Sequence, residues 1–120
     1  MRALFDLRLL FVAILAISAC ARLGNAAEIT LDLTIRHWQL SKGMRTIKVQ
    51  EGDAVTLRLC VDRPMTLHLH GYDIERRVEP GAVTDITFMA NATGRFPLEI
   101  HIGDHAEARG PIAYVEVYPR

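Results

Sequence analysis

Two histidines, His68 and His70, stand two residues apart in an apolar stretch that ends at Gly71. Successive side chains of an extended chain alternate between two faces, so these two imidazoles project from the same side. Neutral imidazole is a frequent metal ligand, and two imidazoles side by side form half of a metal site. The spacing therefore indicates a metal-binding strand.

Two further histidines flank a turn in the C-terminal half of the chain. The candidate metal set then has four members, which are His68, His70, His101 and His105. Ligand type alone does not choose the ion, because imidazole suits Cu(II), Zn(II), Ni(II) and iron. The alternative interpretation is that the four are polar surface residues and that the domain binds no metal.

Several neighbouring side chains bear on this hypothesis. Glu99 and Asp104 are placed to accept the second ring N–H of a ligating histidine, and Met65 could offer a soft sulfur ligand. His37 is isolated, and we expect it at a strand end or in packing. Cys60 falls opposite the leucines of its strand, which favours an inert thiol over a ligand.

The first part of the chain is typical of a secretory signal peptide. Arginines precede an apolar run over residues 9–17 that is too short to span a bilayer comfortably, and small residues follow it. Signal-peptidase cleavage would give a mature chain from Ala27, whereas a lipobox-like sequence would make Cys20 an acylated first residue. We expect residues 1–26 to be removed and residues 27–120 to form one periplasmic domain, lipid-anchored if Cys20 is the processing site.

Charge and cysteine content narrow the possible partners. The sequence has 14 basic and 14 acidic residues; without the three arginines and one aspartate of residues 1–26, 11 basic and 13 acidic residues remain, a net charge of −2. The sequence has no basic patch, so nucleic acid is not expected as a partner. Cys60 has no cysteine left to pair with in the mature domain, and no intrachain disulfide is expected.

Alternation of apolar and polar residues dominates the mature chain and predicts strands. The runs lie at 29–36, 46–49, 55–60, 65–69, 83–90, 96–102 and 112–117. Turns separate them, notably at residues 51–53 and 79–81, and residues 103–110 are expected to be a loop with room for one helical turn. About seven short strands in a chain of this length predict an all-β fold, a single Greek-key β-sandwich.

The last seventy residues resemble the cupredoxins, small Greek-key sandwiches that hold copper at one end. The matching features come in the family's order: the turn at 51–53 leading into 54–57, a histidine-containing strand, the turn at 79–81, the segments 86–88 and 94–96, a ligand loop, and a final strand at 115–117. The resemblance implies a copper-related domain and favours copper over other ions.

The resemblance also implies that a blue copper site is absent. Blue-copper members carry a cysteine a few residues after the Gly-x-aromatic turn, followed by a histidine and a methionine. Counted from Gly94, the cysteine position falls on Ile100 and the histidine position on His105, and the methionine position holds no soft ligand. A blue site needs the thiolate. Three residues could match the family's first histidine, namely Met65, His68 and His70.

We therefore expect an exported bacterial metal-binding protein, with copper the favoured ion and zinc the alternative. Its role would be copper binding, delivery or tolerance, with a periplasmic or membrane protein as a partner. A metal-free sandwich that serves as a periplasmic interaction module is the competing hypothesis. An enzyme is not expected, because the sequence has no Ser/His/Asp spacing, paired carboxylates or phosphate loop.

Overall fold

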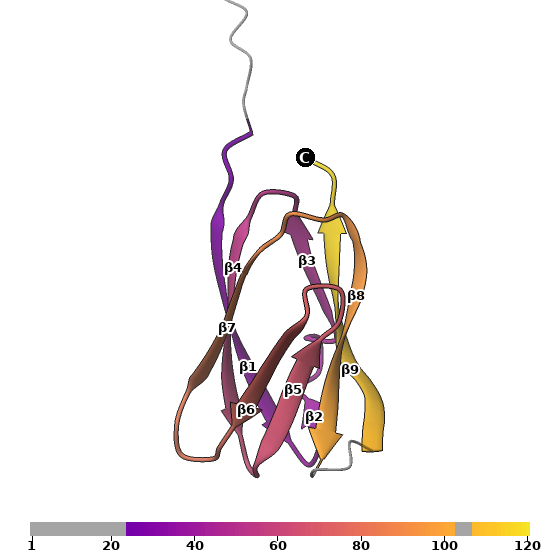
Figure 1. Ribbon diagram of the computed structural model, residues 1–120. Coiled ribbons are helices and arrows are strands. Elements are labelled where there is room, and N and C mark those ends of the chain that lie inside the picture. The colour runs from indigo at the N-terminus through magenta and orange to yellow at the C-terminus, as the bar shows by residue number, and fades with distance from the viewer. Residues whose placement is uncertain (1–23, 103–106) are drawn as a thin grey trace, which may run out of the picture.

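The computed structural model describes residues 24–102 and 107–120, and all regular structure in these ranges is β. The strands, labelled in Figure 1, are β1 (Glu28–Arg36), β2 (Gln39–Leu40), β3 (Thr46–Gln50), β4 (Ala54–Val61), β5 (Met65–Leu69), β6 (Ile74–Val78), β7 (Thr84–Met89), β8 (Gly94–Ile102) and β9 (Glu107–Tyr118). The described part of the chain contains no helix that could cross a membrane. The proposed signal peptide lies almost wholly outside the described residues, so its removal stays a prediction.

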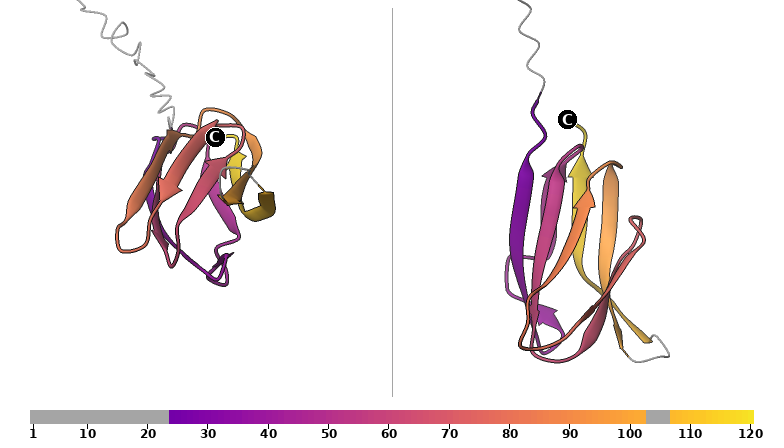
Figure 2. Two further views of the ribbon diagram at one scale, coloured as in Figure 1. Left: turned by 60° about the horizontal axis from the view of Figure 1, so that its bottom comes forward. Right: turned by 60° about the vertical axis from the view of Figure 1, so that its left-hand side comes forward.

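The strands form two sheets that face each other (Figure 2). One sheet has the order β2-β1-β4-β7 and the other the order β3-β9-β8-β5-β6. The chain leaves β4 in the first sheet, forms the β5–β6 hairpin in the second, and returns to place β7 beside β4. The predicted all-β Greek-key sandwich is therefore confirmed.

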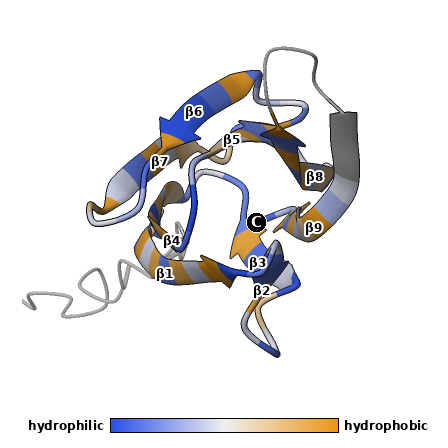
Figure 3. Ribbon diagram, turned by 90° about the horizontal axis from the view of Figure 1, so that it is seen from below, coloured by the Kyte–Doolittle hydropathy of each residue, from blue (hydrophilic) through white to orange (hydrophobic). Residues whose placement is uncertain are grey.

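Alternation along the strands directs one face of each sheet into a shared core, around which the strands are arranged in Figure 3. On β5 the side chains of Met65, Leu67 and Leu69 are at most 2% exposed. Burying one such side chain contributes about 1.5–3 kcal/mol. A slip of β5 by one residue would expose all three, so the core fixes which side chains of β5 face solvent.

The C-terminal hairpin differs from the sequence-based expectation. Residues 103–110 are predicted to be a loop, but β9 already begins at Glu107 and pairs with β8 from there. The register between the two strands shifts twice near Glu99, and Gly110 adopts a φ of +78°. These bulges let the strand continue through a Gly-Pro pair that, read locally, is typical of a loop. Residues 103–106 lie outside the described chain.

Candidate metal centre

Strand β5 presents its histidines on the outer face of the five-stranded sheet. Leu67 and Leu69 point into the core, so His68 between them points outward. His70 follows the last residue of β5, and its backbone N–H donates to the carbonyl of Pro97 at 3.0 Å. This hydrogen bond holds the chain beside β8 beyond the end of β5 and keeps His70 next to His68.

Strand β8 supplies the third histidine. It pairs with β5 so that His101 lies across from Thr66 and Glu99 across from His68. Ile100 is fully buried, which directs its neighbours Glu99 and His101 to the outer face. The long-range pairing of β5 with β8, which lies beside it in Figure 1, is therefore what joins His101 to the other two histidines.

The three imidazoles converge on the sheet surface. Each offers one nitrogen, and these three atoms all lie within 4.8 Å of one another. The ring centroids of His68 and His70 are 3.9 Å apart, and that of His101 lies 5.3 Å from His68 and 6.3 Å from His70. All three side chains are partly buried. The arrangement fits three ligands of one metal ion.

Carboxylates surround the histidines. Glu99 Oε2 lies 2.8 Å from His70 Nε2 and 3.8 Å from His101 Nε2, and Glu75 Oε1 lies 3.5 Å from His101 Nδ1. Asp73 extends the acidic rim, with its Oδ1 3.9 Å from the third imidazole, that of His68. Such carboxylates orient imidazole rings and offset the charge of a bound cation. The supporting position expected for Glu99 is thus occupied, whereas Asp104 lies outside the described residues.

The turn between β5 and β6 holds His70 in place. Gly71 adopts a φ of +83°, and a Cβ on it would lie 2.3 Å from Phe96 Cδ1. The ring of Tyr72 packs 4.7 Å from that of Phe88 and 4.9 Å from that of Phe96. Any residue other than glycine at position 71 would clash with Phe96. Glycine is therefore needed for the backbone conformation that follows His70.

Other predicted site residues lie elsewhere. His105 is outside the described residues, so its place relative to the cluster stays a prediction. Met65 is buried on the core side of β5, opposite His68, and its sulfur is not available to the cluster. Cys60 is exposed on β4, in the other sheet, which agrees with the parity argument.

His37 lies apart from the cluster, as expected. It sits in the tight turn between β1 and β2 with a φ of +51°. Its backbone N–H donates to Asp62 Oδ2 at 3.0 Å. This hydrogen bond, with a further one from the Arg63 guanidinium, holds the pKa of Asp62 below its ordinary value. His37 thus has a structural place in a strand-end turn.

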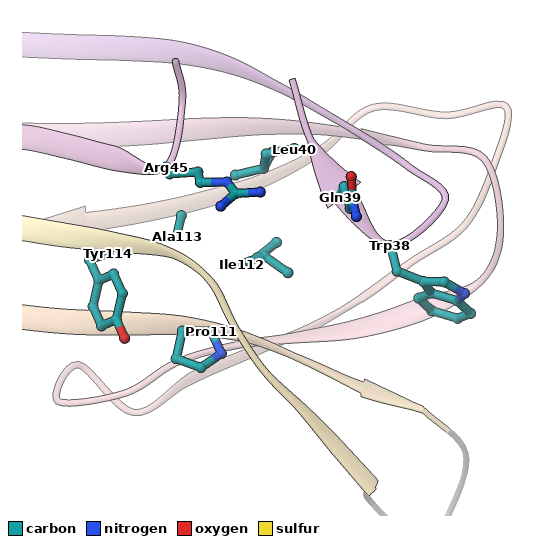
Figure 4. Close-up of a pocket in the computed structure, with 8 residues that line it drawn as sticks. All are labelled: Trp38, Gln39, Leu40, Arg45, Pro111, Ile112, Ala113 and Tyr114. Atoms are coloured by element: carbon teal, nitrogen blue, oxygen red, sulfur yellow. The ribbon is translucent and has the colours of Figure 1, made fainter. Parts of the chain in front are cut away.

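A pocket of about 260 Å³ lies between the β1–β2 turn and β9 (Figure 4). Its lining residues are Trp38, Gln39, Leu40, Arg45, Pro111, Ile112, Ala113 and Tyr114. No histidine of the cluster is among them, so the candidate metal centre is a feature of the open sheet face and separate from this pocket.

Comparison with known proteins identifies the fold. No family sequence model matches the chain, and no curated protein matches it in sequence. Among solved structures, the blue copper oxidase of Nitrosomonas europaea matches with a TM-score of 0.62 and 22% identity over 80% of this chain and 40% of that one. A multi-copper oxidase from Pseudomonas thermotolerans matches with a TM-score of 0.60 and 19% identity over 80% and 31% of the two chains. The fold is cupredoxin-like.

One chain in the structure of a heme-copper terminal oxidase dimer also matches this cupredoxin-like sandwich, with a TM-score of 0.57 and 23% identity over 73% of this chain and 63% of that one. The protein spans less than half the length of the two copper oxidases. At these identities the likeness establishes the fold alone.

The described residues that the sequence resemblance assigns to the family's metal-ligand positions lie on two different faces of the five-stranded sheet. Ile100, at the family's cysteine position, is buried in the core. Of the three candidates for the family's first histidine, Met65 shares that side, whereas His68 and His70 lie on the outer face with His101. The candidate metal centre therefore lies on the opposite side of the sheet from Ile100.

Proposed function

We propose that this protein binds a metal ion, with copper the favoured one, through His68, His70 and His101, and that it acts outside the cytoplasm in copper binding, delivery or tolerance. The observation that carries the proposal is the convergence of three imidazole nitrogens within 4.8 Å of one another. These imidazoles come from two separate segments of the chain, the end of β5 and strand β8, which the sheet pairing brings side by side.

Copper is favoured by three arguments of different kinds. Imidazole is a good ligand for Cu(II). The similar solved structures include two copper oxidases. The signal-peptide-like start of the sequence favours an exported protein. Zinc is the competing ion, because it accepts the same ligands.

Binding rather than catalysis is supported by the placement of the cluster. The histidines lie on an exposed sheet face, and the pocket of Figure 4 contains none of them. Enzymes usually enclose an organic substrate in a concave site. An ion on an open face is instead accessible to a partner protein that delivers or receives it.

Metal titration of the exported protein tests the proposal. We expect about one Cu(II) per chain, and we expect His68→Ala, His70→Ala and His101→Ala each to lower the affinity more than about 100-fold, since loss of even a residue that only supports a ligand costs 10–100-fold. His37→Ala is the matched control and should leave affinity unchanged. Small, equal losses from all four variants would mean adventitious binding and would favour the metal-free interaction module.

A further inference from the structure

We propose that Glu99 is the fourth ligand of this centre, and that its carboxylate makes the site select divalent ions over Cu(I). The inference rests on the proposed metal site at the three histidines and adds a residue and an oxidation state to it. It stands on the distances around Glu99, on its burial, and on the places of the two sulfur atoms that could serve Cu(I).

The distances fit a shared ion. Metal–nitrogen and metal–oxygen bonds in four-coordinate protein sites are about 2.0–2.2 Å, which places neighbouring ligand atoms about 3.3–3.5 Å apart. Glu99 Oε2 lies 2.8 Å from His70 Nε2 and 3.8 Å from His101 Nε2, on either side of that value. Side-chain adjustments of about half an ångström bring Glu99, His70 and His101 to ligand spacing. Glu99 is not among the groups whose ligand atoms already lie within 4.8 Å of one another, so ligation also requires its carboxylate to move toward His68.

Glu99 is distinguished from the other acids of the rim by burial. Its side chain is 19% exposed, whereas that of Glu75 is 59% exposed and that of Asp73 is fully exposed. A partly desolvated carboxylate needs a charged or strongly polar partner. In the described chain, the polar contacts of Glu99 are to His70 and His101. A bound cation would satisfy all three groups at once.

The remaining acids then have an orienting role. Glu75 contacts Nδ1 of His101, which leaves Nε2 of that ring for the ion, beside Glu99. Asp73 is nearest to Nε2 of His68, and the Nδ1 of that ring is buried without a hydrogen-bond partner. A buried imidazole nitrogen without a partner is unfavourable, and a metal ion would provide the missing interaction.

Charge and ligand softness set the preference for divalent ions. Cu(I) favours thiolate and thioether ligands, but Met65 faces the core and Cys60 lies on the other sheet. The attraction between a carboxylate and an ion doubles when the ion carries two charges instead of one. Glu99 therefore stabilises Cu(II) or Zn(II) more than Cu(I).

The test compares the affinities for three ions, Cu(II), Zn(II) and Cu(I), across three variants. Glu99→Gln keeps the size of the side chain and removes its charge; we expect it to lower the affinities for Cu(II) and Zn(II) about 100-fold or more and the affinity for Cu(I), measured without oxygen, less than about 10-fold. Glu99→Asp keeps the charge and should retain the preference for divalent ions. Glu116→Gln is the matched control, because Glu116 is 22% exposed on the same sheet but pairs with Arg95; it should change no affinity.

The outcomes separate this inference from the proposed function. If Glu99→Gln leaves Cu(II) affinity unchanged, Glu99 neither binds the ion nor orients the histidines; if it lowers Cu(I) and Cu(II) affinity equally, Glu99 only orients the histidines. In both cases the inference fails while the metal site stands. If the unaltered protein binds neither Cu(II) nor Zn(II), the proposed function fails and the inference fails with it. A Cu(II) electron paramagnetic resonance spectrum that changes on Glu99→Gln, but not on Glu116→Gln, supports direct ligation.

Discussion

His70 and His101 share one ion in the proposed centre, so their contributions to its binding should not add. Removal of either should weaken Cu(II) binding strongly, and the double variant His70→Ala/His101→Ala should be little worse than the single ones, because the site is already broken. Competition with a chelator of known affinity measures the three constants. Losses that add fully would indicate that the two histidines bind separate ions.

The spectrum of bound copper is a second prediction about single residues. Position 100 holds a buried isoleucine in place of a cysteine, and the thiol of Cys60 lies on the other sheet. Neither position therefore supplies a thiolate to the three histidines. We expect Cu(II) to give no intense sulfur-to-copper absorption and to show the wide hyperfine splitting of nitrogen and oxygen ligands. Cys60→Ser should leave the spectrum unchanged. An intense blue colour that this variant abolishes would contradict the strand arrangement.

At this scale the sequence predicts only part of the site. The shared face of His68 and His70 follows from the two-residue period of a strand. His101 lies next to the other two histidines because of the register between β5 and β8, and Glu75 lies near them because of the register between β5 and β6. Such pairings link distant residues, and a local pattern does not determine them. The two-residue period does place Met65, three residues before His68, on the opposite face.

The β5–β6 turn makes the clearest prediction at the level of elements. Gly71→Ala must adopt a φ near +83° and place a Cβ against Phe96, so we expect it to lower the free energy of unfolding by about 1–3 kcal/mol and to weaken metal binding by moving His70. Urea unfolding and Cu(II) titration measure the two effects.

Gly81→Ala is the matched control for that turn. Its φ is +87°, but a Cβ there has no atom within 4 Å. It should cost only the backbone strain, about 1–2 kcal/mol, with metal affinity unchanged. If the two variants lose the same stability and the same affinity, the contact with Phe96 does not position His70.

The strands themselves were accessible from sequence because alternation and turn residues coincide along most of the chain. The exceptions are β2 and β6, which lie outside the predicted runs, and the start of β9, where Gly110 and Pro111 carry the local signature of a loop. Bulges absorb both residues within a strand, and the compensating contacts come from β8, which local patterns do not contain. Elements were thus predictable where local preference and sheet pairing agree.

On the scale of the whole molecule, the carboxylate of Asp53 contacts residues near the first strand and after the last strand. Asp53, in the turn between β3 and β4, is buried and accepts hydrogen bonds from the backbone N–H of Gln50 at 2.8 Å and of Ala27 at 3.1 Å. The guanidinium of Arg120, beyond the end of β9, pairs with the same side chain. Asp53 therefore links the start of the first sheet to the end of the second.

These contacts predict how stability depends on pH. The N–H groups of Gln50 and Ala27, together with Arg120, hold the pKa of Asp53 below its ordinary value of 3.8. Because the folded state favours the charged form, this stabilisation is fully present above pH 3.8 and is lost as pH falls through the lower folded-state pKa. Asp53→Asn, measured by urea unfolding, should be less stable at pH 7 and should lose less stability on acidification. Equal acid sensitivity of both proteins would show that Asp53 does not couple the two ends.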